Sequence, residues 1–571
     1  MRETQRCPNA PCAHPRMQVR KQPSTTSSDR SLQVSLDPEL LRGVGLQDCL
    51  ANWAQPFASS REKRASSVSF ETEQYDNFLS HDWGTSRWLK LVVLLVVFNS
   101  RAAAVACFLV SVLCSIFGAL GVLPMAVWPA IPGYAAFFLT FCFWQRIRWL
   151  LGIPVVVFMD KLCITQDDQE LKEKGILGLA AFLDRSSKLT VIWSITYFQR
   201  LWCAYEVSTF LRHKSKSRPV DTMPTTVAIL LVLDCLSWWC IRAAHFLLED
   251  ATGQRMSLQK LPLVAIFYAL LALVMLVANF YLGIQLVDDI SRLPQQLAAF
   301  SIQDAHCSCC SLGHVDPKSG EAIPCDRDLV FATLKIWYGP DLPLEDALMN
   351  FNKFVRQRLA PQILKSVGGA RLPLGYTLFM IGTCNLPWLF RSTILLSSGP
   401  GVELEGFGVV VWALRVCIDW AYVPMLALFN IRLKMALIVL GNRMCAFMPK
   451  LVVALLLPLV ALAGISVPRA AFTQAVRATE DDSLIPGIPF LLLAGILLAL
   501  FSSPPSLFFP THAEPEENSN SEATTFSKRS EVQPDGHGLT VIEQVMEAIC
   551  ESLEEPNHPD DPKDPDDVFE V

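Results

Sequence analysis

An uncharged run of 22 residues, 102–123, lies between two segments that have the composition of β-strands, and it limits what this chain can fold into. A helix of about 20 predominantly apolar residues is long enough to cross a bilayer. The composition agrees with a membrane location, because 51% of the residues are hydrophobic and 18% are charged, against about 25% charged residues in soluble domains. We therefore expect an α-helical polytopic membrane protein.

Seven further apolar runs bring the expected number of membrane spans to about eight. The eight runs are 102–123, 126–144, 225–247, 261–282, 372–390, 407–429, 451–467 and 485–501. Lys and Arg gather in loops that all fall on one side if both termini are cytosolic, among them the loop between the sixth and seventh runs with Arg432, Lys434, Arg443 and Lys450. This is the arrangement that the positive-inside rule favours. The sequence thus predicts a multi-pass protein with both termini in the cytosol, and it does not indicate the organelle.

The runs divide the chain into soluble and membrane parts. The predicted parts are a disordered N-terminal tail (1–66), an α/β domain (67–220) with an inserted transmembrane hairpin (102–144), a second transmembrane hairpin (221–284), a cytosolic Cys-rich segment (285–371), a four-span region (372–502) and an acidic disordered tail (503–571). The tail contains one short amphipathic pattern at 539–555, where apolar residues recur every four positions. The rest of it is too acidic and too poor in large apolar groups to fold alone.

The predicted α/β domain contains three β-rich runs that alternate with helix-like segments, a pattern typical of a parallel sheet. The runs are 75–79, 154–159 and 189–193. Ligands of such sheets lie outside the carboxyl ends of the strands. The polar residues at those ends are Ser80, Asp82, Asp160 and Ser194. They are candidate ligand contacts, and the alternative for the two aspartates is a helix-capping or turn carboxylate.

Four sequence pieces in this domain resemble the TIR domain. They are YDNFLSHDWG (75–84), VFMD (157–160), the stretch 175–194 with its Gly-Ile pair, and RLWCAYEV (200–207), which looks like the last TIR signature. DKLCITQDD (160–168) and the Arg-Leu-Trp of the last piece also resemble, more loosely, the heterokaryon-incompatibility domain. The resemblance covers roughly 90 residues, and the chain departs from the family in the membrane hairpin inserted after the first strand.

The resemblance implies a function and one catalytic residue. In TIR enzymes the Glu of the last signature is the catalytic residue of NAD hydrolysis, which places this role on Glu206. A carboxylate can stabilise the oxocarbenium-like transition state that forms when a glycosidic bond breaks. The expected function is sensing or signalling at a membrane, with NAD as a substrate or with the domain acting as an assembly scaffold that self-associates. A surface glutamate paired with a neighbouring arginine is the structural alternative for Glu206.

The Cys-rich segment contains a run of thiols and imidazoles at short spacing. Its residues are His306, Cys307, Cys309, Cys310, His314 and Cys325. Such groups can complete a tetrahedral zinc site, although Cys-x-Cys-Cys is not a standard zinc spacing. Disulfides are disfavoured in the cytosol, so reduced cysteines that pack in a structured loop are the alternative.

A transporter or channel regulated by its cytosolic α/β domain is the other class of function that the sequence allows. Arg415 and Asp419 stand four residues apart in the sixth run, which places them one turn apart on one helix face. Charges inside a membrane usually pair, and they often mark a transport pathway. The net charge of −6 and the absence of a basic, aromatic-rich patch in the sequence give no basis for a nucleic-acid partner, so the lipid bilayer is the expected partner.

Overall fold

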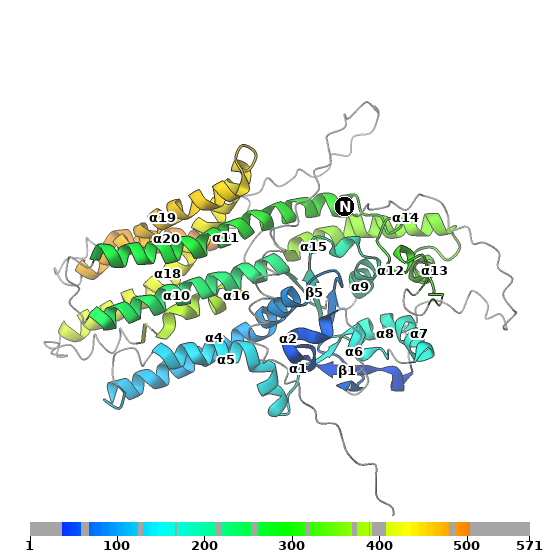
Figure 1. Cartoon of the computed structure of the whole chain (residues 1–571), viewed down its shortest axis with the longest axis horizontal. Coiled ribbons are helices and arrows are strands. Elements are labelled where there is room, and N and C mark those ends of the chain that lie inside the picture. Colours follow the sequence, from blue (N-terminus) through cyan, green and yellow to red (C-terminus); the bar gives the residue numbers. More distant parts are fainter. Residues whose placement is uncertain are drawn as a thin grey trace, which may run out of the picture.

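The computed structural model is mostly helical and combines a bundle of long helices with a small α/β unit (Figure 1). It describes residues 37–502, except for gaps at 59–67, 124–129, 166–167, 213–217, 253–260, 316–319, 321, 368–373, 388, 391–406 and 479–486. Residues 1–36 and the predicted acidic tail with its helix 539–555 lie outside the described residues. In Figure 1 the long helices occupy one half of the molecule, and the strands and short helices occupy the other.

Six strands form one mixed sheet in the order β2-β1-β4-β3-β5-β6. Their bounds are β1 Arg42–Gly45, β2 Phe70–Glu71, β3 Asn77–His81, β4 Val156–Phe158, β5 Leu189–Trp193 and β6 Val220–Pro224. The strands β4, β3, β5 and β6 run parallel, which confirms the parallel pairing of the three runs predicted from the sequence. The expectation of an entirely parallel sheet is wrong, because β1 pairs antiparallel with both β2 and β4.

Alternation along β3 sends successive side chains to opposite faces of the sheet. Phe78 faces the helices α8 (Leu179–Asp184) and α9 (Leu201–Arg212), and its ring stacks on Phe158, which in turn meets Phe182 of α8. His81 faces the other way and meets the ring of Phe57 at 5.0 Å. The sheet is therefore covered on both faces, and Ser80 shares the α9 face with Phe78.

Residues 37–58 are folded, which differs from the disordered tail expected for 1–66. They contain η1 (Pro38–Leu40), β1, α1 (Leu46–Cys49), α2 (Ala51–Ala54) and η2 (Gln55–Phe57). Val44 and Leu46 are fully buried and Phe57 is nearly so. These apolar side chains are buried in the core, and β1 pairs with β4. The polar residues between them led to the expectation of disorder.

The inserted hairpin consists of α4 (Arg87–Ala119) and α5 (Ala130–Leu150), which lie side by side (Figure 1). The helix α4 begins at Arg87, well before the expected start of the span at residue 102, and is continuous through it. Asn99 on α4 holds the pair together, because its amide donates to the carbonyl of Phe141 at 2.8 Å and accepts from Gln145 at 2.7 Å.

Long apolar helices make up the rest of the bundle. They are α10 (Thr225–Thr252), α11 (Leu261–Ala298), α18 (Phe407–Met444), α19 (Lys450–Ala478) and α20 (Ile488–Ser502). Within the part of the chain that is described, four helical stretches are long and apolar enough to cross a membrane: Arg87–Ala119, Leu273–Ala298, Val410–Met444 and Lys450–Val476. By their length and apolar composition, these four helices indicate a multi-pass membrane protein.

Two expected spans differ from the helices that form. The run 372–390 is not one straight helix, because α16 (Leu374–Met380) is followed by the 3-10 turn η5 (Gly382–Asn385). The expected loop after residue 429 is helical, because α18 continues to Met444.

The Cys-rich segment forms α12 (Ser308–Ser311), α13 (Asp326–Tyr338), α14 (Leu344–Phe354), the π-helical turn η4 (Val355–Leu359) and α15 (Ala360–Val367), and α15 packs near β6.

Candidate functional site

Ser80, near the carboxyl end of β3, lies at the centre of the candidate site. Its hydroxyl donates to a carboxylate oxygen of Glu206 on α9 and also meets the phenol oxygen of Tyr197. Tyr197 belongs to the 3-10 turn η3 (Tyr197–Gln199), which joins β5 to α9. Because Ser80 gives its single proton to Glu206, Tyr197 donates to Ser80. The three side chains form one hydrogen-bonded row at the strand ends.

The position of α9 over the sheet is fixed by contacts of its first turn. The Cys203 thiol contacts the backbone carbonyl of His81 at 3.5 Å, and Leu201, Ala204 and Tyr205 are buried. Glu206 lies one turn after Trp202 on the same helix, so the face that carries the Trp-Cys pair also presents the glutamate to Ser80.

Burial changes the acid–base behaviour of this row. Burial raises the pKa of Glu206 to about 8, the hydrogen bond from Ser80 opposes the rise, and the charge of Asp160 adds to it. Burial also raises the pKa of Tyr197 well above its ordinary value. The Glu206 residue is partly buried, not fully buried. A carboxyl group whose pKa is raised by burial and which accepts a hydrogen bond from a serine hydroxyl at the strand ends is typical of a functional site.

Replacing Glu206 by Gln should change the pH dependence of stability. Between the ordinary pKa of 4.5 and the folded value of about 8, the folded protein keeps a proton that the unfolded chain releases, so stability falls as pH rises through this window. Glutamine does not ionise. The melting temperature of Glu206→Gln should therefore rise relative to wild type from about pH 5 to about pH 9, equivalent to on the order of 3 kcal/mol after allowance for partial exposure. Thermal unfolding in detergent measures this, and a difference independent of pH would contradict it.

Asp82 is almost completely buried and is fully engaged by its neighbours. It accepts hydrogen bonds from the Thr196 hydroxyl at 2.6 Å and the Gly84 amide at 2.9 Å, and it forms an ion pair with Arg200 at 3.0 Å. Ser194 lies 3.2 Å from the same Thr196 hydroxyl. Both predicted residues thus lie at the expected edge, and the contacts of Asp82 are those of a turn carboxylate that also holds Arg200.

Asp160 begins the short helix α6 (Asp160–Cys163) and accepts from the Trp83 indole at 2.9 Å. Its other oxygen accepts from the amide of the adjacent Lys161 at 2.7 Å, but Met159 is the N-cap of α6, so Asp160 does not cap the helix. Burial raises the pKa of Asp160. The structure brings the four predicted strand-end residues to one edge but divides them into three groups, of which only Ser80 contacts Glu206.

Sequence reasoning missed the two buried basic groups on the opposite face of this edge. The Lys90 ammonium, on α4, is completely buried and has no hydrogen-bond partner among the described residues, and it lies 5.0 Å from the ring of Trp83 and 5.7 Å from that of Phe57. Both ring nitrogens of His81 are likewise buried without a partner there, and burial lowers the pKa of His81. The signal for the buried Lys90 was a lysine within the apolar run WLKLVVLLVV (88–97).

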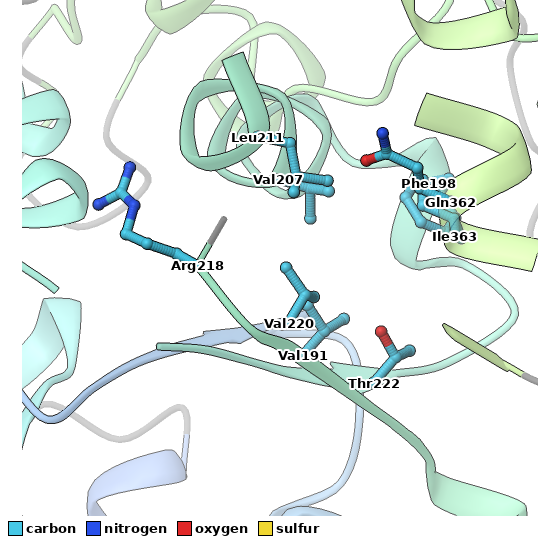
Figure 2. Close-up of a pocket in the computed structure, with 9 residues that line it drawn as sticks. All are labelled: Val191, Phe198, Val207, Leu211, Arg218, Val220, Thr222, Gln362 and Ile363. Carbon is cyan, nitrogen blue, oxygen red and sulfur yellow. The ribbon is translucent and has the colours of Figure 1, made fainter. Parts of the chain in front are cut away.

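A cavity of about 170 Å³ lies beside this site rather than over it. Figure 2 shows Val207 and Leu211 of α9 facing Val191 and Val220 of the sheet, with Ile363 of α15 at one side. The lining is mainly apolar and contains none of the residues predicted for the site, although Val207 follows Glu206 directly. The cavity can hold an apolar group between α9 and the sheet.

Four of the six predicted metal ligands come together in the Cys-rich segment. The thiols of Cys309, Cys310 and Cys325 and a ring nitrogen of His314 lie within 4.8 Å of one another. Burial raises the pKa of Cys309 to about 11 and also raises the pKa of Cys310 and Cys325, so a cation is needed to stabilise them as thiolates. This Cys3His cluster could bind a metal such as zinc.

The other two predicted ligands have different partners. His306 meets the Arg200 guanidinium at 2.8 Å and the Ser311 hydroxyl at 3.0 Å. The Cys307 thiol lies 3.1 Å from that of Cys309 and belongs to a second possible group with Cys309 and Asp326. The structure thus places His306 at the boundary between the Cys-rich segment and α9.

The helix bundle contains an ion pair that the sequence did not predict. Asp234 on α10 pairs with Lys434 on α18, and their side chains are 6% and 12% exposed. Lys434 is therefore a buried helical residue, not one of the cations of a cytosolic loop. Arg415 and Asp419 both lie on α18 and are partly buried, and their pairing stays a prediction.

Comparison with models of known families, with curated proteins and with solved structures found no match.

Proposed function

We propose that this protein is a membrane-anchored signalling protein whose α/β domain cleaves the glycosidic bond between ribose and nicotinamide in NAD. The observation that carries the proposal is the row of Tyr197, Ser80 and Glu206 at the carboxyl ends of parallel strands. Its glutamate is the residue to which the TIR resemblance assigns catalysis. The row also lies where ligands bind in sheets of this kind.

The chemistry of the step matches what this row can do. When the C1′–N bond breaks, the electron pair leaves with nicotinamide, which becomes neutral, and positive charge develops on the ribose. The Glu206 carboxylate stabilises that charge, and water then attacks C1′ and releases a proton, giving ADP-ribose. A pKa near 8 leaves part of Glu206 ionised at neutral pH, and the cationic nicotinamide ring favours the ionised form further.

The membrane part has an anchoring role in this proposal. We infer that the apolar helices cross the membrane with both termini in the cytosol, since most of the Lys and Arg residues between the apolar runs then fall on the cytosolic side. The hairpin of α4 and α5 then holds the sheet at the membrane surface, because α4 begins directly after β3. Anchored domains at one surface are concentrated in two dimensions, which favours self-association through the α/β domain.

Transport through the bundle is the second candidate, and the Asp234–Lys434 pair favours it. Ionisable side chains inside a membrane bundle are expensive to bury and often line the path of an ion or proton. Beside this pair, Ser237 of α10 accepts from the amide of Asn279 on α11 at 3.3 Å. An ion flux into vesicles that contain the protein, and its loss in Asp234→Asn, would favour transport.

Product analysis tests the proposed activity. The purified full chain in lipid nanodiscs is incubated with NAD, and the products are separated by chromatography and quantified by mass spectrometry. Equal amounts of nicotinamide and ADP-ribose are expected. Intact NAD after incubation, both with dispersed protein and with protein at high density in vesicles, would reduce the domain to a scaffold.

A further inference from the structure

The Cys3His cluster is built against helix α9. Asp326 follows Cys325 directly, and its amide donates to the Cys309 sulfur at 3.2 Å. The carboxylate of Asp326 accepts from the indole of Trp202 at 3.1 Å. One residue therefore contacts both a cluster thiol and the first turn of α9.

A second connection runs through the backbone before the cluster. His306 and Arg200 form a parallel bridge, in which the Leu201 amide donates to the His306 carbonyl at 3.1 Å and the His306 amide donates to Gln199 at 2.6 Å. Arg200 in turn holds Asp82 at the end of β3. The Cys-rich segment thus supplies backbone partners at the start of α9, where an N-terminal amide would otherwise lack one.

The donor set of the cluster selects the metal. Three thiols and one imidazole in a group of this size suit tetrahedral Zn²⁺, whereas Ca²⁺ and Mg²⁺ require oxygen ligands. An independent observation also indicates a ligand here: the Nε2 atom of His314 is buried and has no hydrogen-bond partner among the described residues. A coordinated cation would satisfy it.

We propose that Cys309, Cys310, His314 and Cys325 hold one zinc ion, and that this zinc centre positions α9 so that Glu206 lies beside Ser80. The metal ties Cys309 to Cys325, 16 positions later. Asp326 and His306 then stay in place against Trp202 and Arg200. Removal of the metal releases these two residues, and α9 loses the hydrogen bonds of Trp202 with Asp326 and of Leu201 with His306.

Two measurements on the full chain in detergent test the proposal. Metal analysis should find about one zinc per chain, and Cys309→Ser or Cys325→Ser should lower it at least about tenfold, since loss of one ligand in four weakens a structural site severely. Chelation of the wild-type protein should speed amide exchange of residues 199–212 at least about tenfold. The amides of α5, which is remote from the cluster in Figure 1, should be unaffected.

Two variants separate the ligand set from the positioning role. Cys307→Ser should keep about one zinc, because Cys307 belongs only to the second possible group with Cys309 and Asp326. Loss of zinc in Cys307→Ser together with retention in Cys310→Ser would overturn the proposed ligands. Trp202→Phe should keep its zinc and still show faster exchange in α9, since it removes the indole donor to Asp326 and leaves the cluster intact.

Absence of zinc from the wild-type protein, both as purified and after addition of zinc, would overturn the proposal. Bound zinc whose chelation leaves the exchange of residues 199–212 unchanged would overturn the positioning role. The effect of the metal on NAD cleavage rests on the proposed function, whereas metal content and amide exchange do not. Metal analysis and amide exchange can therefore contradict the zinc centre even if NAD cleavage is confirmed, and the absence of NAD cleavage leaves the zinc centre untouched.

Discussion

Replacement of Asp234 by Leu is expected to destabilise the protein by about 3–5 kcal/mol, because the change leaves the Lys434 ammonium buried without its counter-ion. The two side chains are 6% and 12% exposed between α10 and α18. Both charges were removed from water when the helices packed, so the attraction between them offsets a large desolvation penalty. Removing one partner takes away the attraction and leaves the penalty of the other.

The double variant Asp234→Leu with Lys434→Leu should recover much of this loss, because apolar residues of similar size often replace a buried pair at little cost. Asp288→Leu is the matched control. Asp288 pairs with Arg292 on α11, but both side chains are 46% exposed, and an exposed pair contributes at most about 1 kcal/mol. Thermal unfolding in detergent compares the variants. An unchanged melting temperature for Asp234→Leu alone would show that water reaches the pair.

The second large effect is expected in catalysis. Glu206→Gln should reduce nicotinamide release at least about 10²-fold, the scale on which preorganised electrostatic groups act in a transition state. Glutamine keeps the size and the hydrogen-bond acceptor that Ser80 uses, but it carries no charge to stabilise the ribose cation. The fold should survive the change, because a neutral side chain at this partly buried position removes a charge that burial disfavours.

The strands were predictable because their signal is local. Each of the three predicted runs has a buried apolar composition that ends in polar residues, and in the structure these runs pair parallel as β3, β4 and β5. The strand β1 has the sequence RGVG, and its two glycines disfavour a strand on propensity alone. It forms because β4 offers an edge and because Val44 is fully buried. Such tertiary compensation cannot be read from four residues.

Contacts between residues far apart in the sequence were the second feature that could not be predicted. Asp234 and Lys434 are 200 residues apart, and the charges near Lys434 suggested a loop, whereas α18 continues as a helix through them. Only four of the six predicted metal ligands meet, because the turn at Gly313 and His314, which both have positive φ, returns the chain toward Cys309. One sequence does not specify which of several thiols such a turn brings together.

In the candidate site, too, some residues were predictable from local sequence and others were not. The RLWCAYEV motif made Glu206 a candidate, and the alternation of β3 explains why Ser80 faces it. Tyr197, which completes the hydrogen-bonded row, was missed because it lies in a 3-10 turn between two predicted elements. Its signal was its position four residues after the end of β5, where a helix over the sheet must begin.

The most direct measurement of the central claim is the rate of nicotinamide release by three purified proteins in nanodiscs under one set of conditions: wild type, Glu206→Gln and Glu170→Gln. Glu170 is an exposed glutamate of α7 (Gln169–Leu177) that pairs only with Lys174 among the described residues, so its variant controls for the substitution itself. We predict release by wild type and Glu170→Gln at equal rates, and at least about 10²-fold less by Glu206→Gln. Equal release by all three proteins, or none by wild type, would contradict the assignment of NAD cleavage to Glu206.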